Sequence, residues 1–134
     1  MEKFLWCSPH TPTEVQKHQL LAGGNSEVLY LKDLNSKLFD KICQSADNYV
    51  QLSIDACSLV DWCNENGIKF IVQPAGSPAF QAVLGMVVYA DREIENPPIE
   101  LVYSHSERVS VDKPNPDGSV TKTSVFNHVK FISI

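Results

Sequence analysis

The sequence predicts a single α/β domain over residues 1–134, in which a mostly parallel sheet is flanked by helices and followed by a C-terminal β-hairpin. Short apolar runs typical of strands alternate with segments of helical periodicity as far as residue 103. Such alternation indicates parallel strands joined by right-handed helical crossovers. Two alternating segments then surround a turn at residues 114–118, which is the pattern of a hairpin.

The first strand–helix unit is the clearest in the sequence. A strand is expected at residues 3–7, before a proline-rich loop that cannot continue it. Thr13 and Gln16 have the spacing of a capping box, so a helix should begin there. Gly23 and Gly24 supply the residues that end it.

A second strand is expected at residues 27–31, and Asp33 or Asn35 should cap the helix that follows. A longer helix comes next, because apolar residues recur at helical spacing over residues 50–63. Gly67 then supplies a left-handed stop. This segment should lead directly into the third strand.

Residues 68–72 form that third predicted strand. Ser77 should cap the next helix, with Pro78 at its first position. The fourth strand is expected at residues 99–103, before the hairpin, and a further strand is expected at residues 127–134.

Composition limits the possible partners. The formal net charge of −5 argues against a long DNA or RNA as ligand, because neutralising many phosphates needs a surplus of Lys and Arg. A compact ligand with a few phosphates needs only a local set of N–H donors and one or two cations. The chain has neither a signal-peptide pattern nor an apolar run of membrane-spanning length, so no membrane partner and a cytoplasmic location are expected.

The cysteines and histidines do not predict a metal site. Cys7, Cys43, Cys57 and Cys63 contain no C-x-x-C pair, and we expect them to be buried free thiols. The four histidines are dispersed and lie at no zinc-finger spacing from the cysteines. We therefore expect no structural metal and no cofactor.

Three polar loops follow predicted parallel strands, at residues 8–11, 73–77 and 104–108. The carboxyl ends of such strands form the usual ligand site of an α/β sheet. Hydroxyl, amide and guanidinium groups in these loops suit a compact phosphorylated ligand. The candidate residues are Ser8, His10, Gln73, Gly76, Ser77, Ser104, His105, Ser106 and Arg108.

These candidates also have structural alternatives. Ser8 could merely cap a turn, and Ser77 could merely cap a helix. Arg108 could pair with Glu107 on the surface, which would contribute little. His128, between Phe126 and Phe131, is typical of a core or interface histidine more than of a catalytic one.

The stretches YSHSER, DGSV and SVFNHVKF, at residues 103–108, 117–120 and 124–131, carry a family resemblance. The opening strand that ends in Cys7-Ser8 and the stretch IVQ at residues 71–73 add to it. On these segments the chain resembles the small, single-domain Csx-type ring nucleases associated with type III CRISPR systems.

This resemblance implies a Rossmann-like, CARF-like fold and a homodimer around a symmetric cyclic oligoadenylate, most readily cyclic tetra-adenylate. The implied activity is cleavage of that messenger, with a ribose 2′-OH attacking the adjacent phosphate without a metal. Ser106, Arg108, His105 and His10 are then the expected catalytic residues. Ser8, Gln73, Gly76, Ser77 and Ser104 are the expected substrate-binding residues.

Three other functions stay open at this point. The same pocket without a well-placed base would hold the messenger intact and act as a sponge. An interaction module with a vestigial nucleotide fold would bind no cyclic nucleotide at all. A Rossmann oxidoreductase is disfavoured because no G-x-G-x-x-G follows the first strand.

Overall fold

A computed structural model describes all residues from 1 to 134. Ten elements follow one another along the chain, and their order confirms the predicted alternation of strands and helices. They are β1 (Glu2–Trp6), α1 (Glu14–Leu21), β2 (Ser26–Tyr30), α2 (Leu31–Leu34), α3 (Ser36–Gln44), α4 (Tyr49–Glu65), β3 (Phe70–Val72), α5 (Pro78–Asp91), β4 (Glu100–Pro114) and β5 (Val120–Ser133).

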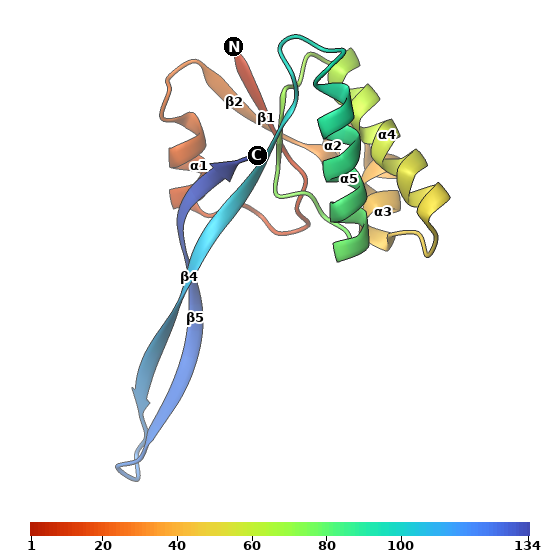
Figure 1. Cartoon of the computed structure of the whole chain (residues 1–134). Helices are drawn as coiled ribbons and strands as arrows, with labels where there is room; N and C mark the ends of the chain where they lie inside the picture. The colour runs from red at the N-terminus through yellow and green to blue at the C-terminus, as the bar shows by residue number, and fades with distance from the viewer.

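The strands form one sheet in the order β2-β1-β3-β4-β5. β2, β1, β3 and β4 run parallel, and β5 runs antiparallel beside β4. The predicted fold class is therefore confirmed. Figure 1 shows α2 to α5 grouped on one side of the molecule and α1 by itself on the other.

The two sides of the sheet carry two separate apolar clusters. The larger cluster includes Leu5, Ile71 and Leu101, which pack with residues from α3, α4 and α5; we call this side the bundle face. The smaller cluster joins Trp6, Val72 and Val102 to Leu20 of α1, and we call this side the α1 face. Successive residues of a strand point to opposite sides. On β4 the even-numbered residues therefore lie on the α1 face and the odd-numbered residues on the bundle face.

Most helix boundaries follow the predicted caps. Thr13 and Gln16 form the expected capping box. Asn35, rather than Asp33, caps α3. Ser77 caps α5, with Pro78 at its start. The short helix α2, which directly follows β2, was not predicted.

The C-terminal part differs most from the expectation. Residues 104–108 do not form a loop, because β4 continues from Glu100 to Pro114 without a break. The second strand of the predicted hairpin and the expected final strand are likewise one strand, β5. β3 pairs with β4 only at residues 100–102, and β4 pairs with β5 along almost its whole length. Residues 106–128 thus form a two-stranded ribbon that leaves the body of the molecule (Figure 1).

All four cysteines are free thiols, but their burial is not uniform. Cys7 and Cys63 are buried as predicted, whereas Cys43 and Cys57 are exposed. The prediction of a buried thiol was therefore wrong for these two, because both lie on the outer surfaces of their helices. None of the helices is long and apolar enough to cross a lipid bilayer.

Candidate functional site

The densest polar contact of the α1 face joins β4 to β5. The side-chain Oγ of Ser104 and Nδ1 of His128 form a hydrogen bond at the base of the ribbon. Both side chains are half-buried, and the ring of Phe131 packs against His128 with 4.6 Å between the ring centroids. A hydroxyl held on an imidazole in this way is a standard arrangement for proton transfer.

A β-bulge explains why His128 lies on this face. Ser104 pairs with Phe131, but Ser106 pairs with His128, so β5 contains one additional residue, Val129, between these two pairs. With regular alternation from Phe131, His128 would point to the bundle face. The additional residue redirects the imidazole to the α1 face, where Ser104 lies.

Gln19 of α1 fixes the tautomer of the imidazole. The Nε2 group of Gln19 donates to the backbone oxygen of Val129 at 3.0 Å, which leaves its Oε1 facing Nε2 of His128 at 2.7 Å. An amide oxygen only accepts, so Nε2 of His128 carries the proton and Nδ1 is the acceptor. Ser104 therefore donates its hydroxyl proton to Nδ1. We call Ser104, His128 and Gln19 the relay.

Two further residues complete the surroundings of Ser104. Ser106 Oγ lies 3.2 Å from Ser104 Oγ. Because the hydroxyl of Ser104 already donates to His128, Ser106 is the donor in this pair. The backbone N–H of Ser104 donates to Oε1 of Gln73 at 2.7 Å, so the loop after β3 holds the strand at this point. Gln73 has a positive φ of 49°, a conformation that costs energy for a residue with a side chain.

The protonation state of His128 agrees with this hydrogen-bond pattern. Partial burial lowers the pKa of His128 from its ordinary value of 6.5, because desolvation disfavours the charged imidazolium. The imidazole is therefore neutral at pH 7, with a free acceptor for the hydroxyl proton. A neutral histidine beside a hydroxyl can act as a general base.

The predicted residues of the first loop lie elsewhere on the same carboxyl edge. Ser8 Oγ accepts from the backbone N–H of His10 at 3.1 Å, and Trp6 Nε1 donates to the backbone oxygen of His10 at 2.6 Å. These bonds are those of a turn. The side chains of Ser8 and His10 line a hollow of about 190 Å³ together with Lys32 and Asp33.

Gly76 and Ser77 are occupied by packing. Ser77 Oγ caps α5 by accepting from the N–H of Phe80, and the N–H of Ser77 donates to Ser45 Oγ at 2.7 Å. A Cβ at Gly76 would lie 2.8 Å from a ring atom of Phe80 and 2.9 Å from the backbone oxygen of Ile42. The loop after β3 thus closes against α3 and α5, and only Gln73 reaches the relay.

His105 and Arg108 lie on the ribbon. His105 belongs to the bundle face of β4, opposite the side of Ser104. Arg108 is on the α1 face, four residues from Ser104 and hence about 13 Å along the strand. Its guanidinium lies 5.2 Å from the centroid of the Phe126 ring and forms no ion pair with Glu107. Arg108 could reach a ligand that extends along the ribbon, but not the relay itself.

The sequence profile of the Uncharacterized protein MJ1673 family matches residues 2–132. The chain belongs to this family. Neither a curated protein nor a solved structure shows significant similarity to it. The match spans β1 to β5, so the relay lies wholly within the part of this MJ1673-family chain that the profile covers.

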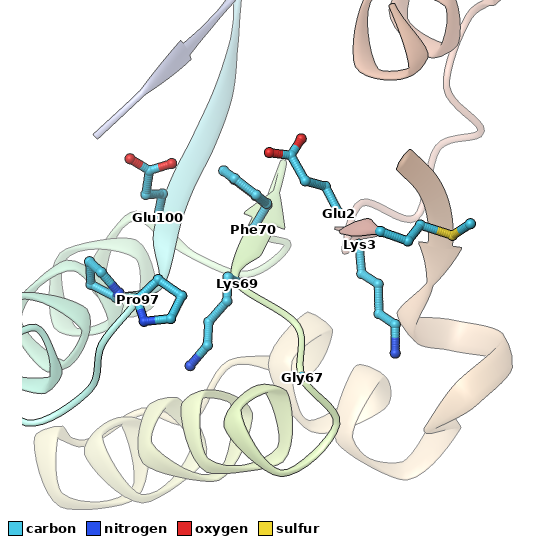
Figure 2. A pocket seen from close by; sticks show the side chains of 9 residues that line it. Glu2, Lys3, Gly67, Lys69, Phe70, Pro97 and Glu100 are labelled. Atoms are coloured by element: carbon cyan, nitrogen blue, oxygen red, sulfur yellow. The ribbon is translucent and has the colours of Figure 1, made fainter. Parts of the chain in front are cut away.

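A hollow of about 360 Å³ in this MJ1673-family protein lies at the other edge of the sheet, near the amino ends of β1, β3 and β4. Figure 2 shows that Lys3 and Lys69 point away from the carboxylates of Glu2 and Glu100. Lys69 Nζ donates to Asn64 Oδ1 at 2.8 Å, and Lys3 Nζ donates to a backbone oxygen at the end of α4. The end of that helix therefore engages both lysine side chains, and Lys69 also lies 3.8 Å from Glu95, so neither lysine is directed at an anion in this hollow.

The buried cysteines of this MJ1673-family protein offer no rival nucleophile. Burial raises the pKa of the Cys63 thiol to about 12, and burial likewise raises the pKa of Cys7 well above its ordinary value. A thiol in this state is protonated at neutral pH, whereas the reactive form is the thiolate. Ser119 Oγ also donates to a base, Asp117 Oδ1 at 2.6 Å, but this contact lies in the exposed turn of the ribbon, whereas the relay pairs a hydroxyl with an imidazole near the carboxyl edge of the sheet.

Proposed function

We propose that the protein binds a cyclic oligoadenylate, most readily cyclic tetra-adenylate, and cleaves it without a metal, switching off type III CRISPR signalling. The observation that supports this proposal is the relay of Ser104, His128 and Gln19 near the carboxyl edge of the parallel sheet. Ligands of parallel sheets bind at that edge. The chemistry needed there is positioning and proton transfer, and the relay is suited to both.

The reaction in this proposal is attack of a ribose 2′-OH on the adjacent phosphate. The 2′-OH passes its proton to Ser104 Oγ while Ser104 passes its own proton to Nδ1 of His128. The 2′-oxygen forms a bond to phosphorus, and the bond from phosphorus to the 5′-oxygen breaks. The imidazolium then returns its proton through Ser104 to the leaving 5′-oxygen, and the product is a linear chain with a 2′,3′-cyclic phosphate.

Each residue of the relay has a separate task in this scheme. His128 is the base, and the carbonyl oxygen of Gln19 stabilises the imidazolium that forms when His128 accepts a proton. Ser106 and Arg108 share the α1 face of β4 with Ser104 and would donate to phosphate oxygens along the strand. Ser8, His10 and Lys32, around the neighbouring hollow, would contact a further part of the ring.

The test uses labelled cyclic tetra-adenylate in large excess over the protein, in the presence of EDTA. Linear products beyond one equivalent, ending in a 2′,3′-cyclic phosphate, are expected from the native chain and not from His128→Ala. If the cyclic tetra-adenylate is bound but recovered intact, the function is sequestration and not cleavage. Absence of any thermal shift with cyclic nucleotides would contradict the whole proposal and favour an interaction module.

A homodimer belongs to the same proposal. The ribbon has a surface that nothing in its own chain covers.

A further inference from the structure

The bundle face of the ribbon carries an apolar stripe with no cover. Val109 and Val125 face each other across the two strands, and Val111 faces Thr123. The valine side chains remain 37%, 43% and 42% exposed at Val109, Val111 and Val125. An isolated two-stranded ribbon is only marginally stable in water and needs packing on one face. The helices of the body lie near the base of the ribbon and do not extend along it (Figure 1).

Two opposite charges flank the stripe and have no partner in the chain. Glu107 lies before the valines and pairs across the ribbon with Asn127, whereas Lys113 lies after them and pairs with Thr121. The ion pairs of the chain involve neither of them. Glu107 and Lys113 are six residues apart on one strand, which corresponds to about 20 Å.

On the other face of the ribbon, each charged residue of β4 faces a complementary residue across the two strands of the same chain. Asp112 lies directly opposite Lys122, and Arg108 lies opposite Phe126 with its guanidinium over the ring. Opposite charges and cation–aromatic pairs at such positions stabilise the ribbon itself. Phe126 and Val120 of this face also stay exposed, at 68% and 56%. The difference lies in the charges, because Glu107 and Lys113 on the bundle face have no oppositely charged or aromatic residue across the ribbon.

We infer that the bundle face of the ribbon binds the same face of a second copy of this chain, across a two-fold axis near Ser110. The pattern on β4 is self-complementary about this point. In an antiparallel arrangement, Glu107 of each copy comes opposite Lys113 of the other, and Val109 comes opposite Val111. Apolar burial supplies the attraction, and the two charge pairs fix the direction and the register.

The same register brings more surface into contact than the stripe alone. With the axis near Ser110, the turn of each ribbon lies opposite residues 102–105 of the other copy, at the base of its ribbon. Ile132 pairs with Tyr103 there and is 43% exposed. Contacts at both ends thus add to the central stripe, as a stable dimer interface requires.

This dimer leaves both relays accessible. Ser104 and His128 lie on the α1 face, so they point away from the axis in each copy. The two sites would be independent, rather than halves of one site around a shared ring. Dimer formation and cleavage can therefore be measured and lost separately.

Charge exchange tests the interface in the full-length protein by sedimentation equilibrium. Glu107→Lys places lysine opposite lysine, and Lys113→Glu places glutamate opposite glutamate, twice in each dimer. Each single variant should raise the dimer dissociation constant by at least about tenfold. The double variant, Glu107→Lys with Lys113→Glu, restores both pairs and should recover the native constant.

The matched control exchanges charges on the other face. Asp112→Lys combined with Lys122→Asp keeps the cross-strand pair and should leave the dissociation constant unchanged. A native chain that is monomeric at high micromolar concentration would overturn the inference, as would single variants that stay dimeric or a double variant that stays monomeric. None of these outcomes bears on cleavage, which the labelled messenger measures independently. Circular dichroism on each variant confirms folding.

Discussion

Ser104 and His128 are 24 residues apart in the sequence, yet the hydroxyl of the first donates to the imidazole of the second across β4 and β5. The contact depends on the additional residue, Val129, that the bulge inserts into β5. Bulges commonly occur next to functional sites because they redirect a side chain. The site is thus formed by a local irregularity in a long regular ribbon.

Replacing His128 by alanine should reduce messenger cleavage by about 10²- to 10⁴-fold, the usual contribution of a positioned general base. The fold should survive, because His128 lies outside both apolar clusters. Single-turnover cleavage and the melting temperature, measured on the same sample, check this. A folded His128→Ala variant with native rate would exclude the relay as the active site.

The pH dependence of stability follows from the same histidine. The pKa of His128 is lower in the folded chain than its ordinary value of 6.5. Between these two values the unfolded chain binds more protons, so the free energy of unfolding rises with pH there. The stability that neutral His128 contributes is complete above pH 6.5 and is lost as the pH falls through the folded pKa. Urea denaturation across this window should show the slope in the native chain and a smaller slope in His128→Gln.

Gln19 is proposed as a positioning residue, and Gln19→Glu tests it without removing the contact. A carboxylate at this place would favour the imidazolium and raise the pKa of His128. The lower limb of the pH–rate profile should move to higher pH, with little change at the plateau. The exposed neighbour His18 supplies the control, since His18→Gln should leave the profile in place. An unchanged profile in Gln19→Glu would show that the amide does not act on His128.

Much of the fold could be predicted because the signals are local. The caps at Thr13, Asn35 and Ser77 lie within a few residues of the N–H groups that they satisfy. Alternating strands and helices likewise allow few topologies other than a parallel sheet. The length of β4 could not be predicted, because its polar stretch at residues 104–108 reads as a loop unless the pairing with β5 is known.

The sequence predicts only some residues of the candidate site, because the others are brought there by the pairing of β4 with β5 and by α1. The sequence makes Ser104 and Gln73 candidates because both follow predicted strands of the parallel sheet. His128 was interpreted as a core or interface histidine, since the face on which it lies depends on the bulge at Val129. Gln19 was missed altogether, because nothing in α1 indicates a contact 109 residues away.

A pair of glycine variants distinguishes the stability cost of a close contact from the cost of a positive φ, and Gly76 is the position with the close contact. Gly76→Ala places a Cβ 2.8 Å from the ring of Phe80, at a φ of 105°, so it should lower the free energy of unfolding by about 2 kcal/mol or more. Gly118→Ala is the control, because Gly118 also has a positive φ, of 87°, but no atom lies near its Cβ position. Gly118→Ala should cost only about 1 kcal/mol. Equal losses in the two variants, measured by urea denaturation, would contradict the tight contact with Phe80.

Gln73 combines a strained backbone with the hydrogen bond that holds Ser104. Gln73→Ala removes the acceptor of the Ser104 N–H and keeps a side chain at a φ of 49°. This variant therefore loses the hydrogen bond and retains the backbone strain of the native chain. Gln73→Gly removes the same acceptor but relieves the strain. Loss of the hydrogen bond should cost about 0.5–1.5 kcal/mol, and relief of the strain should return about 1 kcal/mol.

The glycine variant should therefore melt close to the native chain and the alanine variant clearly below it. Both variants should lose messenger cleavage by a similar factor, because in both the N–H of Ser104 is free and the hydroxyl is less well held against His128. This separation of stability from rate is the signature of a residue that positions the relay. If the glycine variant kept the native rate, Gln73 would be a packing residue only, and the position of Ser104 would be set by its pairing with β5 alone.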